Sequence, residues 1–450
     1  MGRHEPTLRV VVTGGCSARE RRDLGRRRHE AFLRHGPDPE LSPRVVPPAE
    51  HGSIATQREN TGSMSAATRW EPRNSEYWYR LGHFQEFNLE DPDPAGATAS
   101  FQKAVQLNPQ YTDAWLDLAT SLELEGDTQR AKDAYLRAER SYPNSAEVAW
   151  RYANFLLRTG DLSAAFSELH RAIQGDPHRA AAAFTRAYRA DPNLDEILEK
   201  VIPPIPSVYV DVISEATASQ RLAFAQIVWQ RLLALKPRLH VGEFDPLVYA
   251  LASDKEYVQA RRVWDQGTST MNLPPLFQPQ GSVVWDPSFE SGIEGSTFAW
   301  HYKPLDQGVR VSLDSSEKLS GIQSLRLSFD GKHNPGLDLA CTSAIVTPGT
   351  SYHLTAWIKA RDITTEQGVH LRIGASVGKD ASPVATKEFH GSLPWTFVDA
   401  TWTAGNDVHG AGICISRDPS DNPDVRISGD VWVDDVNLVP DATAAEPRKL

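Results

Sequence analysis

The chain has 450 residues, enough for about three domains of average size, so one undivided core is not expected. Its 47 Lys and Arg residues and 58 Asp and Glu residues give a net charge of −11. This balance argues against general nucleic-acid binding, which needs a basic face. No run of about 18 uncharged apolar residues occurs, so no transmembrane helix is expected.

The first 73 residues have the composition of a disordered tail. They carry 13 Arg, no Lys and 9 acidic residues, include a Pro-rich run, and show no sustained apolar period. A lipoprotein-type export signal ending at Cys16 is disfavoured because its apolar core is short and is broken by Arg9. If Met64 is the true start, this segment says nothing about export. The compartment therefore stays open between the cytoplasm, which is the default without a signal, and the envelope or the exterior.

A pattern of apolar, small and proline residues then recurs with a period of about 34 residues. Its positions in the second copy are Trp115, Leu118, Ala119, Leu122, Gly126, Ala131, Tyr135, Ala138 and Pro143. The third copy repeats them offset for offset as Ala149, Tyr152, Ala153, Leu156, Gly160, Ala165, Leu169, Ala172 and Pro177. The first copy is partial and reads Trp78, Leu81, Gly82, Ala97, Phe101, Ala104 and Pro109.

Each copy predicts two helices joined by a turn, because offsets of three and four residues place side chains on one helix face. In the second copy Gly126 falls where the first helix must stop and Asp127 can cap the next helix. Pro143 ends the pair, since its ring and missing N–H cannot continue a helix. In period and in these identities the copies resemble the tetratricopeptide repeat.

The pattern decays after residue 177 but persists. Residues 178–200 predict one helical stretch, and further sets at 225–237 and 244–267 restore the spacing of helix pairs. We therefore expect an α-solenoid over 74–270 in which stacking supplies the core. The best repeats are 75–109, 112–143 and 146–177.

A solenoid of this kind offers a concave groove lined by the first helix of each pair. The aromatic residues of the pattern are expected to pack between helices, so groove candidates are the polar positions beside them. These are Arg80, Asp117 and Arg151. We expect this groove to bind a protein partner.

After a linker at 271–281 the helical period ends and short alternating runs begin. Runs such as 324–329 and 431–438 alternate apolar and polar residues, and Gly, Pro, Asp and Asn punctuate the gaps. This pattern predicts an antiparallel β-sandwich over 282–440, of a size that suits a jelly roll. Residues 441–450 are expected to be a disordered tail. The fold class is thus a multidomain α + β protein.

Several motifs occur in order in this β-rich region. They are Asp286-Pro287-Ser288-Phe289-Glu290, Ser320-Gly321-Ile322-Gln323-Ser324, Val346-Thr347-Pro348-Gly349-Thr350, Thr401-Trp402-Thr403 and Val431-Trp432-Val433-Asp434-Asp435. In identity and order they resemble the galactose-binding-like jelly roll of many carbohydrate-binding modules. The resemblance implies a fold more than a ligand, because this fold hosts sugar-binding, protein-binding and structural modules.

The same resemblance implies a structural calcium between the opening acidic residue and the acidic pair of the last strand. Carried over by position, this names Glu290 with Asp434 or Asp435, and Glu317 as a further contributor. Carboxylate oxygens from strand ends suit calcium. The alternative is that these acids cap turns or face water.

Sugar binding would need an exposed, flat aromatic ring flanked by polar donors. Trp300 and Tyr302 lie in a loop-like segment and could supply the ring. The candidate donors are His370, Arg372 and Arg417. Three tryptophans in strands are expected to be core instead, namely Trp357, Trp402 and Trp432.

No catalytic motif occurs, since the chain lacks H-E-x-x-H, paired cysteine spacing, a P-loop and G-x-S-x-G. Its three cysteines cannot form a disulfide framework. Cys341 and Cys414 lie in β runs and are expected to be buried small apolar residues. The sequence therefore predicts a protein that is not an enzyme, with no cofactor beyond the implied calcium.

Two hypotheses of different class remain open. In the first, the chain is a scaffold whose solenoid binds a protein partner and whose jelly roll is an accessory module. In the second, the jelly roll recognises a polysaccharide and the repeats tether it to envelope or export machinery. The oligomeric state and the identity of either partner stay open.

Overall fold

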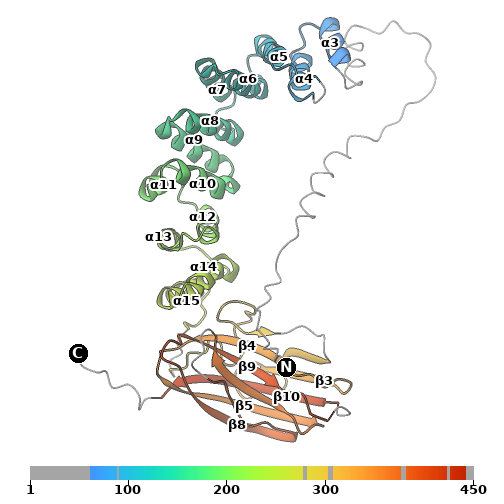
Figure 1. Ribbon diagram of the computed structural model, residues 1–450, viewed down its shortest axis with the longest axis vertical. Helices are drawn as coiled ribbons and strands as arrows, with labels where there is room; N and C mark the ends of the chain where they lie inside the picture. The colour runs from blue at the N-terminus through green and yellow to red at the C-terminus, as the bar shows by residue number, and fades with distance from the viewer. Residues whose placement is uncertain are drawn as a thin grey trace, which may run out of the picture. The chain divides into compact units, whose positions relative to one another are not determined.

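The computed structural model describes residues 61–88, 91–276, 281–302, 308–376, 382–422 and 426–441. Within them a helical region precedes two β-sheets (Figure 1). The chain forms two compact units, residues 1–108 and 109–450. Residues 1–60 and 442–450, for which tails were predicted, lie outside the described residues.

The helical region has the element order that the repeat pattern predicts. Its helices are α3 (Thr61–Trp70), α4 (Ser75–Phe87), α5 (Pro94–Leu107), α6 (Thr112–Leu124), α7 (Thr128–Ser141), α8 (Ala146–Thr159), α9 (Leu162–Gly175), the 3-10 turn η2 (Pro177–Arg179), α10 (Ala180–Ala190), α11 (Leu194–Lys200), α12 (Pro206–Ala218), α13 (Leu222–Ala234), α14 (Val241–Ser253) and α15 (Tyr257–Thr270).

Two helical segments differ from the sequence prediction. Residues 61–70 were assigned to the tail, yet they form α3, which packs on α4 and buries Met64 and Ala67. Two buried apolar side chains on so short a stretch give no detectable period. Residues 178–200 were predicted as one helical stretch, yet Asp191, Pro192 and Asn193 separate α10 from α11, because a proline disfavours helical backbone at the residue before it.

Caps and turns start and stop the repeat helices where the sequence predicts. The side chains of Asn74, Asp93, Asp127, Ser145 and Asp161 each accept a hydrogen bond from a backbone N–H in the first turn that follows. Two glycines follow the first helices α6 and α8 with a φ of 83°, a left-handed conformation that costs glycine nothing. They are Gly126 and Gly160.

The small residues of the pattern permit close helix packing. Ala119, Ala131 and Ala138 are fully buried, as predicted, between α6 and α7. In the first repeat a Cβ added to Gly82 would lie 2.6 Å from ring atoms of Phe101, so α5 can approach α4 only because residue 82 lacks a side chain.

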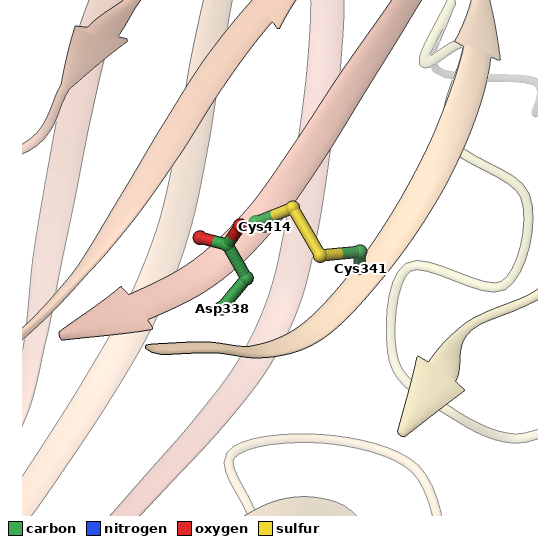
Figure 2. A group of neighbouring side chains, drawn as sticks. All are labelled: Asp338, Cys341 and Cys414. Atoms are coloured by element: carbon green, nitrogen blue, oxygen red, sulfur yellow. A yellow bond between two sulfur atoms is a disulfide. The ribbon is translucent and has the colours of Figure 1, made fainter. Parts of the chain in front are cut away.

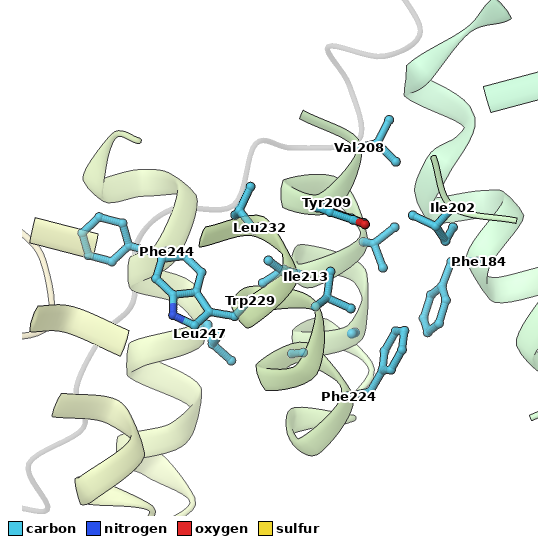
Figure 3. Close-up of a cluster of buried hydrophobic side chains, with 14 of the residues drawn as sticks. Phe184, Ile202, Val208, Tyr209, Ile213, Phe224, Trp229, Leu232, Phe244 and Leu247 are labelled. Atoms are coloured by element: carbon cyan, nitrogen blue, oxygen red, sulfur yellow. The ribbon is translucent and has the colours of Figure 1, made fainter. Parts of the chain in front are cut away.

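From α8 onward the solenoid shares one hydrophobic cluster that runs through every later pair. Figure 3 shows its centre, where aromatic and branched side chains from α10, α12, α13 and α14 interdigitate. The rings of Phe184 and Phe224 stack with centroids 4.8 Å apart. These degenerate repeats therefore still bury their apolar faces by stacking, as expected for a solenoid. Among the described residues, none of the helices combines the length and apolar character needed to cross a bilayer.

The C-terminal region is a sandwich of two five-stranded sheets, with neighbouring strands antiparallel. Its strands are β1 (His301–Tyr302), β2 (Val309–Asp314), β3 (Ser324–Asp330), β4 (Leu337–Ile345), β5 (Ser351–Ile363), β6 (Val369–Ala375), β7 (Val384–Ala385), β8 (Gly391–Thr403), β9 (Gly410–Arg417) and β10 (Ser428–Pro440). The sheet orders are β1-β4-β9-β6-β7 and β2-β3-β10-β5-β8. The predicted jelly-roll type of sandwich is thus present.

The strand tryptophans divide between the two faces of the second sheet. Trp402 lies in the core between the sheets, as predicted. Trp357 alternates with the buried Ala356 and Ile358, so its side chain points outward and is only half-buried, and the core prediction for it is wrong. Trp432 is buried, but it lies on the outer face beneath charged side chains.

Cys341 and Cys414 form a disulfide between β4 and β9. The prediction that they are buried small apolar residues is wrong, because both alternate with core residues and are half-buried on the outer face. Their spacing of 73 residues gives no local signal of the pairing.

The last helix pair packs directly against the start of the sandwich. Trp264 of α15 meets Trp285 and Phe298 edge to face, with ring centroids 5.0 and 5.4 Å apart, and all three side chains are buried. The Asp265 carboxylate accepts a hydrogen bond from the backbone N–H of Leu276 (2.6 Å), which is also buried. The first part of the predicted linker is therefore packed into this interface, and residues 277–280 lie outside the described residues.

Candidate functional site

Polar contacts join the first helices of consecutive repeats. Arg151 of α8 donates hydrogen bonds to the carboxylate of Asp117 (2.8 Å) and the hydroxyl of Thr120 (2.7 Å) on α6. Two helical turns further along α8, Arg158 donates to both carboxylate oxygens of Glu123 (2.6 and 2.8 Å). The partners are 31 to 35 residues apart, so each contact crosses one repeat.

The same type of contact joins α8 to the next repeat. Arg179 donates to Glu147 (2.8 Å), and Arg186 donates to the side-chain oxygen of Asn154 (2.7 Å). The Arg186 guanidinium also lies 4.3 Å from the ring centroid of Trp150, within cation–π range. These contacts hold consecutive repeats together, so the side chains that form them are already engaged within the protein.

Two of the three predicted groove residues pair with each other, and the third belongs to the other compact unit. Asp117 and Arg151 form the inter-repeat ion pair described above, with 13% and 27% of their side chains exposed. Arg80 belongs to the other compact unit and pairs with Glu76 one turn earlier in α4 (2.7 Å). A role of these residues in partner binding stays a prediction.

A hollow surface lies instead on the first helices of the later repeats, α10, α12 and α14. It consists of two adjoining open pockets that share Ala218. The first is lined by His178, Ala181, Asp211, Ser214 and Glu215, and the second adds Tyr249, Ser253 and Asp254. We call this surface the acidic groove.

The acidic groove combines negative charge with one exposed ring. Partial burial raises the pKa of Asp211, and the nearby His178 opposes that rise. Glu215 accepts hydrogen bonds from the hydroxyls of Thr185 (2.9 Å) and Ser219 (3.2 Å), which fix its carboxylate. Tyr249 keeps 56% of its surface exposed. The sequence analysis did not single out these residues because the repeat pattern is weakest in this part of the chain. One signal was available, since the offsets around Phe244 place Tyr249 on a different helix face from the packing residues.

The outer face of the sheet β1-β4-β9-β6-β7 carries a polar cluster beside the disulfide. Asp338 lies next to Cys341 and Cys414 (Figure 2). Its carboxylate accepts a hydrogen bond from the Ser416 hydroxyl (2.7 Å) and forms an ion pair with Arg372. Arg372 therefore lies on an open face, as a sugar donor would need, but it is already paired.

The other predicted sugar-binding residues do not form a common site. Trp300 is fully buried against Phe289 and donates its indole N–H to the Asp286 carbonyl (3.0 Å), so it offers no ring face to a ligand. Tyr302 is half-buried and shares the core-facing side with Ala340, and burial raises its pKa. The strands β4 and β9 separate both residues from His370 on β6.

Arg417 is a structural residue in this arrangement. Its side chain is 1% exposed and donates to the carbonyls of Gln367 and Pro335 and to side-chain oxygens of Asn334 and Thr365. Burial lowers its pKa. These four bonds engage four of the five N–H groups of the guanidinium within the protein, so a role of Arg417 as a sugar donor stays a prediction.

An aromatic pair, Trp357 and Phe397, lies on the outer face of the second sheet. The sequence analysis expected Trp357 in the core and did not single out Phe397. The rings of Trp357 and Phe397 meet at 5.5 Å across β5 and β8, and Phe397 is 50% exposed. Beside them three cations, Arg326, Lys359 and Arg361, lie 4.6 to 5.8 Å from the Trp432 ring centroid. This face has the flat ring and the flanking donors that the predicted site lacks.

The four acids implied in calcium binding accept hydrogen bonds from backbone, lysine and asparagine groups. Asp434 is fully buried and accepts hydrogen bonds from the N–H groups of Leu319 and Ser320 (2.9 and 3.2 Å). Glu290 accepts from Ile322 N–H (2.8 Å), and Glu317 pairs with Lys359 (2.5 Å). Asp435 accepts from the Asn437 amide (2.8 Å). Calcium binding here stays a prediction, and these bonds fasten the loop before β3 to the last strand.

Comparisons with known proteins agree with the helical architecture. Residues 89–149 match the tetratricopeptide repeat family. An uncharacterised protein of Methanocaldococcus jannaschii is 34% identical to the chain over 65 residues, which make up 14% of this chain and 72% of that protein.

Solved structures with partial likeness include a MamA protein and a family 16 carbohydrate-binding module. The first is 17% identical with a TM-score of 0.31 and covers 39% of this chain and 92% of its own. The second is 20% identical with a TM-score of 0.22 and covers 29% of this chain and 86% of its own. These two likenesses carry no functional assignment. The matched family and the stacked helix pairs show that the chain belongs to the tetratricopeptide repeat family, with a β-sandwich following its repeats.

Proposed function

We propose that this protein is a non-catalytic scaffold whose solenoid binds an extended, basic segment of a protein partner in the acidic groove. The observation that carries the proposal is the pair of adjoining pockets along α10, α12 and α14. A groove that crosses consecutive first helices matches the way a solenoid presents a binding surface.

The chemistry of the groove selects the kind of partner. Asp211, Glu215 and Asp254 outnumber the single imidazole of His178, so the groove favours Lys or Arg side chains. The exposed Tyr249 ring can pack on an apolar side chain or on the stem of a lysine. The net charge of −11 adds a long-range attraction for a cationic segment.

The proposal predicts charge-selective peptide binding by the full-length chain. Extended peptides of equal length that are rich in Lys and Arg should bind, whereas uncharged and acidic ones should not. The double variant Asp211→Asn, Glu215→Gln should weaken the Kd for the basic peptides about tenfold, and Tyr249→Ala should have a similar effect. Fluorescence anisotropy measures both, and added salt should weaken binding because exposed charges are screened.

Matched controls lie in and directly after the second helix α7. Asp133→Asn removes an exposed acid from α7, and Tyr142→Ala removes a ring that is 57% exposed, against 56% for Tyr249. Both controls should leave the Kd unchanged. Equal affinity for peptides of all charges, or unchanged binding in the groove variants, would contradict the proposal.

A second candidate function is glycan binding by the aromatic pair Trp357 and Phe397. A half-exposed ring pair on a sheet face, flanked by Lys359 and Arg361, suits the apolar face of a pyranose and its hydroxyls. In this case the repeats would tether a polysaccharide-binding sandwich to other machinery.

Glycan binding predicts a signal for the full-length chain on a glycan array. Trp357→Ala and Phe397→Ala should each weaken the affinity for a glycan hit about tenfold, because stacking area is lost. Phe87→Ala, which removes a 68% exposed ring from α4, is the matched control and should change nothing. An array without hits removes this candidate and leaves the scaffold proposal untouched.

A further inference from the structure

Three side chains from separate segments converge around β6, the neighbour of the edge strand β7 in the first sheet. His370 lies on β6, Asp418 directly follows β9, and Glu388 lies in the segment between β7 and β8. The His370 Nδ1 is 3.8 Å from a Glu388 oxygen, and its Nε2 is 3.9 Å from an Asp418 oxygen. One potential ligand atom from each residue lies within 4.8 Å of the other two.

The histidine supplies a second and independent observation. Its side chain is only 2% exposed, yet its Nδ1 has no hydrogen-bond partner among the described residues. Leaving a buried polar atom without a partner costs free energy, and native proteins rarely do so without a reason. The nitrogen faces Glu388 at a distance too long for a hydrogen bond, which leaves its lone pair or proton unused.

The surrounding charges favour a cation. Arg417 interacts electrostatically with three acids of this region, Glu366, Glu388 and Asp418. The charge sum of these groups is therefore negative even with Arg417 counted. When the Gln367 amide is oriented with its nitrogen toward Glu388, it donates to both carboxylate oxygens (3.3 and 2.8 Å).

We propose that His370, Glu388 and Asp418 form a binding site for a divalent transition-metal cation of the zinc type. One imidazole and two carboxylates suit zinc, whereas calcium prefers oxygen ligands alone. Tetrahedral ligands at about 2.1 Å from zinc lie about 3.4 Å apart. The carboxylates of Glu388 and Asp418, which are 34% and 58% exposed, can close the remaining distance by rotamer changes.

The bound cation would join β6, the end of β9 and the segment before β8. It would also satisfy the orphan imidazole nitrogen. A fourth position would stay open to water, which is where an oxygen of a ligand could bind. This site is separate from both the acidic groove and the pair Trp357 and Phe397, so it does not depend on either candidate function.

Zinc titration of the untagged, metal-free full-length chain tests the proposal. Calorimetry should give one zinc at this site, and saturating zinc should raise the melting temperature by several degrees. His370→Gln should weaken zinc binding at least tenfold and abolish the rise, as should Glu388→Gln and Asp418→Asn. Cobalt in place of zinc should give an absorption spectrum of a histidine–carboxylate site that disappears in His370→Gln.

The matched control is His353→Gln, because His353 is half-exposed on the other sheet and, within the described part of the chain, pairs with a single acid, Asp441, at 3.5 Å. It should bind zinc like the wild type. If His370→Gln does not fold, the two exposed carboxylate variants carry the test. No zinc binding by the wild-type chain, or equal binding in the Glu388 and Asp418 variants, would overturn the proposal, as would a calcium-induced shift of the same size that depends on His370.

Discussion

Replacing Trp285 by alanine should lower the free energy of unfolding by about 3–5 kcal/mol, the cost of deleting a fully buried tryptophan. The ring lies edge to face against Trp264 and donates its indole N–H to the Pro274 carbonyl (3.0 Å). Its removal would leave a cavity between α15 and the sandwich. Urea denaturation of the full-length chain, followed by tryptophan fluorescence and by circular dichroism, measures the loss.

The control for this prediction is Trp70→Ala, because Trp70 is 54% exposed. Its loss should cost under about 1 kcal/mol, as surface substitutions usually do. If Trp285→Ala changed stability as little as Trp70→Ala, the last helix pair and the sandwich would not depend on each other.

The interface explains how the solenoid ends. A stack of helix pairs leaves an apolar face uncovered at each end, and a capping element must cover it. Here Trp264, Phe244 and their neighbours meet Trp285, Phe298 and Ala299 of the segment before β1 in one continuous cluster. The segment that opens the sandwich therefore covers the apolar end of the last helix pair, and we expect the two to stabilise each other.

The repeats could be predicted from sequence because their constraints are local. Gly126 must take a left-handed backbone, Ala131 must admit a neighbouring helix, and Asp127 must cap one, so identity at a fixed offset reports structure directly. The strands were equally readable from alternation. The helix pairs after residue 177 keep only the apolar spacing of the pattern. That spacing predicts which residues pack between helices, but it does not locate a groove.

The candidate sites could not be predicted because they depend on pairing between distant strands. The register of β5 on β8 pairs Trp357 with Phe397 and Tyr352 with Trp402, which puts the two tryptophans on opposite sides of the sheet, and alternation within one strand does not reveal that register. The pairing of Cys341 with Cys414 and the approach of Asp418 to His370 both follow from β9 lying between β4 and β6. No spacing along the chain records that strand order.

The second large effect is expected for Arg417→Ala, which should destabilise the sandwich by about 3–5 kcal/mol, the usual cost of breaking a buried charged network. The guanidinium donates to four acceptors from the segments around 335 and 366, and the substitution would leave them without their donor. Arg417→Lys should recover only part of this, because an ammonium group cannot reproduce the planar fork.

Arg372→Ala is the matched control on the neighbouring strand. That side chain is 38% exposed and has Asp338 as its ion-pair partner, so its loss should cost about 0–1 kcal/mol. The urea midpoint of the full-length chain measures both variants. If Arg417→Ala were as mild as Arg372→Ala, the buried guanidinium would not hold the loops between the strands, and a role in ligand binding for Arg417 would have to be reconsidered.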